Sequence, residues 1–120
     1  MEGARSGPDN RSGMVGKGSD SAAVLDDVRR LRDAPSPPIE DAERVLTDGY
    51  ALVLRAEGER LRLRSRLEQH ATRLGPASGG DEVVEIAALA QGIARVDGEI
   101  EQLRRALDEL AARVRGLRIA

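Results

Sequence analysis

The sequence predicts an all-α protein built around an antiparallel two-helix coiled-coil hairpin, and two observations lead to this fold class. The first is a row of aliphatic residues in the last third of the chain, whose spacing alternates between three and four residues as in a coiled-coil seam. The second is the near absence of aromatic residues, since Phe and Trp do not occur and Tyr50 is the only Tyr. A core without rings favours branched aliphatic side chains between long helices. The row consists of Ile86, Leu89, Ile93, Val96, Ile100, Leu103, Leu107, Leu110, Val114 and Leu117.

The beginning of the chain is expected to add one short element to this hairpin. Residues 1–18 are rich in glycine, serine and scattered charges, so we expect them to form a disordered tail. A short amphipathic helix is predicted over residues 19–34, and alone it would be only marginally stable. Its apolar stripe is formed by Val24, Leu25, Val28 and Leu31.

Prolines and glycines predict where the long helices begin and end. A proline-rich segment ends the short helix, because proline lacks the N–H donor that a helix interior needs. Gly75 is expected to cap the first long helix and Pro76 to stop it. Long helices joined by a short loop fold back on each other. The predicted hairpin spans residues 39–118, with helices at 39–74 and 81–118 and a loop at 75–80.

The first long helix carries more apolar surface than a hairpin partner can cover. Residues 45–54 are apolar on nearly every side, whereas one neighbouring helix covers only one face. The remainder must contact the short helix, a second copy of the chain, or a different protein. We therefore expect a homodimer or a complex with another helical protein. The expected partner-binding residues are Val24, Leu25, Val28, Leu31, Val45, Tyr50, Leu52 and Leu54.

Composition argues against several functional classes. The chain has 19 basic and 21 acidic side chains, so bulk charge does not favour nucleic acid or a membrane surface. Base stacking is not expected either, because aromatic residues are not interleaved with the basic ones. No apolar run is long enough to span a membrane and the N-terminus lacks a signal-peptide stretch, so we expect a cytoplasmic protein. With His70 as the only histidine and no cysteine, we expect neither a metal site nor an enzyme.

Arginines on the first long helix leave two interpretations open. Arg55, Arg62, Arg66 and Arg73 are separated by seven, four and seven residues, which places them on one helix face. Such a row could bind phosphates or an acidic partner through bidentate hydrogen bonds. Alternatively it is a solvated face with local pairs, such as those of Glu59 with Arg62 and Arg64 with Glu68.

Residues 44–57 resemble the first coiled-coil helix of the actinobacterial RsiG-type anti-sigma factors. Members of this family bind cyclic di-GMP on an antiparallel helical hairpin and sequester a sporulation or flagellar-type sigma factor. The family carries a motif of Glu, Ser, Arg, Gln and Asp. When this motif is aligned with the present sequence, Arg44 falls on the motif Arg and Asp48 on the motif Gln. A second alignment places Arg64 on the motif Arg. The resemblance thus implies cyclic di-GMP as a ligand of Arg44, Asp48 and Arg64, and a sigma factor as partner.

Together, the residues and the resemblance predict a non-enzymatic, protein-binding regulator, most concretely an anti-sigma factor. The alternative is a structural or adaptor coiled-coil protein that only self-associates.

Overall fold

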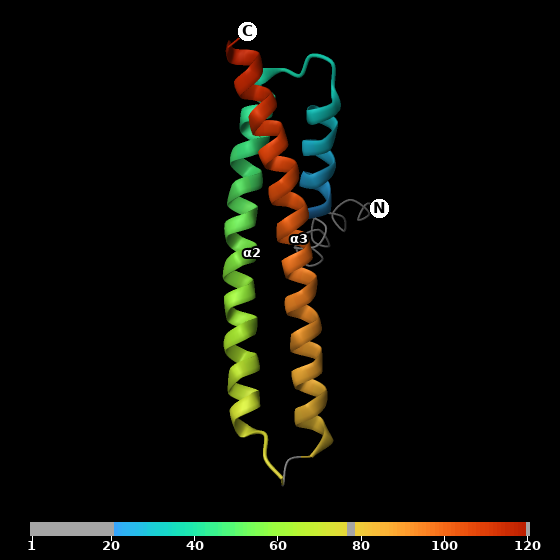
Figure 1. The fold of residues 1–120 in the computed structure, drawn as a ribbon, viewed down its shortest axis with the longest axis vertical. Helices are drawn as coiled ribbons and strands as arrows, with labels where there is room; N and C mark the ends of the chain where they lie inside the picture. Colours follow the sequence, from blue (N-terminus) through green and yellow to red (C-terminus); the bar gives the residue numbers. More distant parts are fainter. Residues whose placement is uncertain (1–20, 77–78, 120) are drawn as a thin grey trace, which may run out of the picture.

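The computed structural model describes residues 21–76 and 79–119, and the regular secondary structure in these ranges is entirely helical. The predicted all-α class is therefore confirmed. The two long helices are α2, Ile39–Arg73, and α3, Gly80–Ile119. They lie side by side and run in opposite directions, and residues 21–33 form a shorter helix beside the end of α3 that leads to the C-terminus (Figure 1). The expected disordered tail at 1–18 lies outside the described residues.

Each long helix begins within one residue of the predicted position, but the predicted cap of α2 is wrong. Leu74, not Gly75, is the C-cap of α2, with extended backbone angles of −71° and 128°, and its N–H donates to the carbonyl of Ala71 at 3.2 Å. No glycine in the described ranges has a positive φ. Gly75 directly precedes Pro76, and a residue before proline favours extended backbone over helical backbone.

The apolar row of α3 forms the long side of the core. Leu107 and Leu110 are completely buried, and Val114 near the end of α3 is 5 % exposed. Ile86, Ile93 and Leu117 are half-buried, and the other members of the row are buried. The predicted seam therefore faces the protein interior along its whole length.

α2 and α3 approach each other closely at Gly49. A Cβ atom placed there would lie 2.5 Å from Cδ2 of Leu107, so a side chain at this position would collide with the core. Ala42 is fully buried on the same face of α2. These small residues let α3 approach α2 closely while Leu107 keeps its full side chain.

Polar side chains pair across the two helices and fit one antiparallel register. Arg60 and His70 are half-buried on α2, on the side that faces α3. Arg60 donates to Asp97 at 2.9 Å, and His70 Nδ1 lies 2.6 Å from an oxygen of Glu82. Each of these half-buried polar side chains therefore has an acidic partner on α3. Further pairs join Glu43 to Arg118, Glu57 to Arg104, and Arg66 to Glu85.

We expect Gly49→Ala to lower the free energy of unfolding by about 1 kcal/mol, because overpacking against Leu107 outweighs the gain in helix propensity. Gly58→Ala is the matched control, since the only atom near its added Cβ is an Arg62 nitrogen at 3.8 Å. This control should raise stability by roughly 0.5–1 kcal/mol. Urea denaturation followed by circular dichroism measures both. Equal stabilisation by the two substitutions would contradict the proposed close approach.

Candidate functional site

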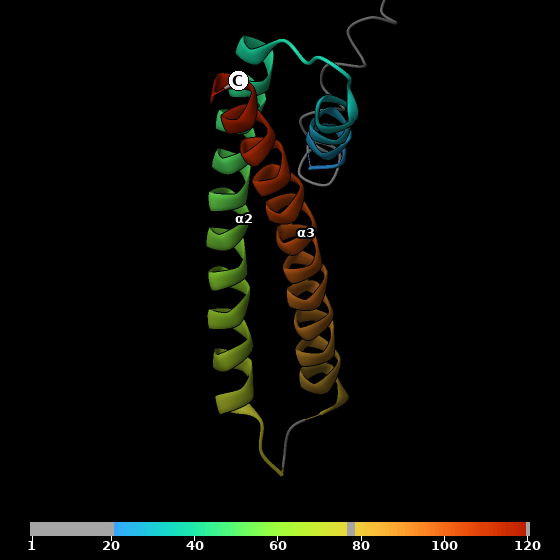
Figure 2. The same ribbon diagram turned by 45° about the horizontal axis from the view of Figure 1, so that its top comes forward.

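The short helix at 21–33 packs against both long helices. On one side, Val24 adjoins Leu52 of α2, and on the other, Leu25 adjoins Leu103 of α3. Val28, one turn further along the short helix than Val24, is completely buried. Figure 2 shows this helix alongside α3, joined to α2 by a linker that passes over the end of the helix pair.

This packing changes the status of the expected partner-binding residues. Val28 and Leu52 are buried within the chain, so the short helix covers part of the surplus apolar surface. It was one of the three candidates for that role. Four further residues are half-buried against the same core, namely Val24, Leu25, Leu31 and Val45. Only Tyr50 and Leu54 remain exposed, at 37 % and 68 %.

Charged groups hold the C-terminal end of the short helix to α3. Arg113 donates to the carbonyl oxygens of Arg32 at 2.6 Å and Pro35 at 2.8 Å. Arg32 in turn donates to Glu109 at 2.8 Å. The carbonyls at a helix end lack partners within the helix, so Arg113 supplies donors that the local sequence does not. We call Arg32, Glu109 and Arg113 the clasp.

The clasp also affects proton binding. The pKa of Arg32 is raised because its guanidinium hydrogen-bonds Asp33 and Glu109. The pKa of Asp33 is lowered, chiefly by the same hydrogen bond from Arg32. A lowered pKa in the folded state stabilises the fold above the unfolded value of 3.8, and this contribution disappears as the pH falls through the lowered pKa.

Neither Glu109 nor Arg113 was predicted as a functional residue. A weak signal for them exists, because the short helix ends before a proline-rich linker without a capping glycine. Such an end needs donors from elsewhere. The sequence does not indicate which arginine provides these donors. Every residue has a backbone carbonyl, so the acceptors cannot be recognised from the residue types.

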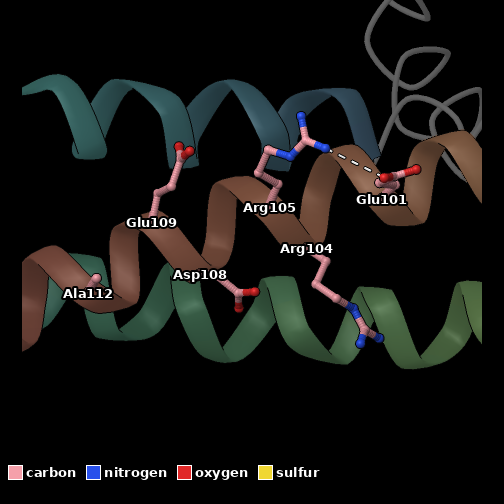
Figure 3. A pocket seen from close by; sticks show the side chains of 6 residues that line it. All are labelled: Glu101, Arg104, Arg105, Asp108, Glu109 and Ala112. Carbon is pink, nitrogen blue, oxygen red and sulfur yellow. Dashed lines mark hydrogen bonds and ion pairs between the residues drawn. The ribbon is translucent and has the colours of Figure 1, made fainter.

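A shallow depression of about 470 Å³ lies on the outer face of α3, along the segment from Glu101 to Ala112 (Figure 3). Glu101 and Arg105 pair with each other along α3 at 3.5 Å, whereas the other charged side chains point to the neighbouring helices. Arg104 and Asp108 turn toward α2, and Glu109 turns toward the short helix. A ligand site needs polar groups that converge on one point. This depression instead results from side chains that reach sideways to the neighbouring helices.

The expected ligand-binding residues are not brought together. Arg44 is exposed and donates to Asp41 at 3.0 Å. Asp48 lies one turn further along α2, beside the short helix. Arg64 is exposed and lies roughly 24 Å beyond Asp48 along the helix, at about 1.5 Å per residue. One ligand of dinucleotide size would therefore contact either Arg44 with Asp48 or Arg64, but not all three.

Local ion pairs account for part of the arginine row on α2. Arg62 pairs with Glu59 at 2.9 Å, as the interpretation of a solvated face predicted. Arg66 lies 3.7 Å from Glu85 of α3. These contacts direct two of the guanidinium groups to acids of the same chain.

An exposed apolar row follows another face of α2. It consists of Tyr50, Leu54 and Leu61, and the two leucines are 68 % and 65 % exposed. Leu54 and Leu61 are seven residues apart and therefore share a helix face, about 10 Å apart along the axis. The Tyr50 hydroxyl donates to Asp108 at 2.7 Å, which ties the ring to α3. We call these three residues the α2 apolar row.

Replacing Arg113 with Ala is expected to loosen the short helix while leaving α2 and α3 intact. Loss of both carbonyl contacts should lower the local stability of residues 22–33 by about 1–2 kcal/mol. Hydrogen exchange of these amides measures the change. Arg105→Ala is the control, because Arg105 contacts Glu101 of its own helix, at 3.5 Å. Equal protection in the two variants would contradict the role of the clasp.

Tyr50 offers a direct measure of the contact with α3. Burial, together with the hydrogen bond to Asp108, raises the pKa of Tyr50 to about 12. Between pH 10 and 12 the unfolded chain loses this proton and the folded chain keeps it, so stability falls over that range. Because Tyr50 is the only Tyr, tyrosinate absorbance reports it alone. Asp108→Asn should move the midpoint of the Tyr50 titration toward pH 10. The control Glu101→Gln should leave this midpoint unchanged.

Within residues 21–76 and 79–119, no group of three or more His, Asp or Glu side chains is placed to hold a metal ion. No helix in the same ranges is long and apolar enough to cross a membrane.

The chain matches no protein-family model, no curated protein and no solved structure.

Proposed function

We propose that the protein is a non-enzymatic, protein-binding regulator of the anti-sigma type, whose antiparallel helix pair serves as a coiled-coil scaffold. The observation that carries this proposal is the α2 apolar row. Leu54 and Leu61 are about two-thirds exposed on a helix whose opposite face is already buried. Large apolar side chains that share an exposed face favour contact with another protein.

The position of the row suits recognition of a helical partner. Leucines seven residues apart repeat the spacing that helices use to pack on each other. Exposed Arg64 lies close to Leu61, and half-buried Glu57 lies between the two leucines. An apolar centre with a charged rim is the usual arrangement of a protein interface. The resemblance of residues 44–57 to anti-sigma factors suggests a flagellar or sporulation-type sigma factor as the partner.

We do not assign cyclic di-GMP to this function. The two motif alignments place Arg44 with Asp48 in one candidate site and Arg64 in another, about 24 Å away along the helix. In the first of these, Arg44 is already paired with Asp41. If adding cyclic di-GMP raised the melting temperature of the protein, the nucleotide would be assigned as a ligand after all.

Self-association is a second candidate function, and the spacing of the leucines favours it. If α2 packed antiparallel on α2 of a second copy, with the two-fold axis near Gly58, Leu54 would meet Leu61 of the other copy. Gly58 has only an Arg62 nitrogen near its Cβ position, at 3.8 Å, so it offers room for close approach.

The double variant Leu54→Glu with Leu61→Glu is expected to weaken binding of a purified flagellar-type sigma factor from the same host by about 10- to 100-fold, as for loss of interface anchors. Calorimetry measures the affinity. Because both side chains are exposed, the melting temperature should change little. Val84→Glu is the control, since Val84 is 67 % exposed but lies on α3, outside the α2 apolar row.

The oligomeric state separates the two candidate functions. A wild-type dimer that the double variant converts to a monomer, together with no affinity for the sigma factor, would contradict the anti-sigma proposal and support self-association. Light scattering of both proteins provides this measurement.

A further inference from the structure

We propose that the surface beneath the short helix is a groove for an amphipathic helix of a partner protein, and that residues 21–33 occupy it until the partner displaces them. This surface differs from the α2 apolar row. The inference therefore stands apart from the proposed function and is tested without a sigma factor.

The floor of the groove is apolar and comes from both long helices. Leu52 of α2 is 7 % exposed, and Leu103 and Ala106 of α3 are 4 % and 3 % exposed. Ala106 lies on the same face of α3 as Gln102 and Glu109, both of which adjoin the short helix. If residues 21–33 left, this floor would face water. A helix must therefore cover it, whether from this chain or from another.

The bound segment shows which chemistry the groove accepts. Val24, Val28 and Leu31 stand at positions i, i+4 and i+7, which is one face of a helix. Arg32 follows directly and meets Glu109. Arg113 binds carbonyls at the helix C-terminal end, which fixes the direction of the occupant. A partner helix should thus carry three aliphatic residues at this spacing and an arginine next to the last.

The short helix has the properties of a removable occupant. Its described part has 13 residues, which is too short for stable helix formation in isolation. Val28 is its only fully buried side chain. Residues 34–38, which connect it to α2, include Pro35, Pro37 and Pro38, so three of five linker positions lack an N–H donor. Pro37 is buried, and the Pro35 carbonyl is held by Arg113 of the clasp, which a release would have to break.

Competition with the tethered segment sets the expected affinities. A short linker gives residues 21–33 a high effective concentration at the groove. A free helix therefore binds with an affinity reduced by the fraction of molecules in which the groove is open. Weakening the tethered segment, without changing the groove, should restore the affinity for the free helix.

The test uses full-length protein carrying Val28→Asp and a fluorescent peptide with the wild-type sequence of residues 19–34. A carboxylate at this buried position should expel the tethered segment. By fluorescence anisotropy, the variant should bind the peptide at least about tenfold more tightly than the wild-type protein does. A peptide carrying the same Val28→Asp change is the control and should not bind. Equal binding by variant and wild-type protein, with the helicity of α2 and α3 retained, would overturn the proposal.

If Val28→Asp prevents folding, Arg32→Glu is a milder variant for releasing the short helix. It places a new carboxylate beside those of Asp33 and Glu109, which Arg32 now binds, and it leaves the apolar contacts unchanged. This variant should bind the wild-type peptide several-fold more tightly than the wild-type protein does. No increase in a folded Arg32→Glu protein would overturn the proposal equally.

A second peptide tests whether the occupant can come from another protein. It keeps aliphatic residues at the positions of Val24, Val28 and Leu31 and arginine at position 32, and is otherwise unrelated to this chain. It should bind the Val28→Asp variant, and exchange of its arginine for Glu should weaken binding about tenfold. If only the chain's own sequence binds, the groove instead accepts residues 21–33 of a second copy. That result would overturn the assignment to a partner protein, and light scattering would then reveal an exchanged dimer.

Discussion

The contact between Leu107 and Gly49 sets the distance between α2 and α3, and the rest of the structure depends on that distance. A fully buried leucine on one helix requires the absence of a side chain on the other, because a Cβ at Gly49 would lie 2.5 Å from Cδ2 of Leu107. At this separation, Tyr50 reaches Asp108 and Glu57 reaches Arg104. The two long helices can then bury the aliphatic row of α3 without any large ring.

Two helices bury only part of the apolar surface near the C-terminal end of α3, which explains why the short helix is needed there. Leu103 and Ala106 are buried on a side of α3 that the short helix covers, and Val28 fills the space between the three helices. Toward the loop, Arg60 and His70 pair with acids of α3, and polar groups take over part of the contact. The molecule thus changes from three packed helices at one end to two at the other.

Much of this fold could be predicted from the sequence, because side-chain spacing and proline positions act locally. The row from Ile86 to Leu117 identified the buried face of α3, and the prolines before Ile39 marked the beginning of α2. The covering of residues 45–54 could not be decided in this way, since any amphipathic helix satisfies the same periodicity. Arg113 was missed for a different reason, because its acceptors are backbone carbonyls. The candidate site therefore depends on contacts between distant segments, which no local pattern encodes.

The groove beneath the short helix and the α2 apolar row differ in which segment can cover them. The difference follows from how far the short helix extends along α2. Thirteen helical residues span about 20 Å, and the linker places the end of this helix close to the beginning of α2. Residues 21–33 accordingly extend along α2 as far as Asp48 and Arg55. Leu61 lies about 33 Å from Ile39 along the axis, beyond that reach. The groove can thus be covered from within the described chain, whereas full burial of the α2 apolar row requires a surface that residues 21–33 do not supply.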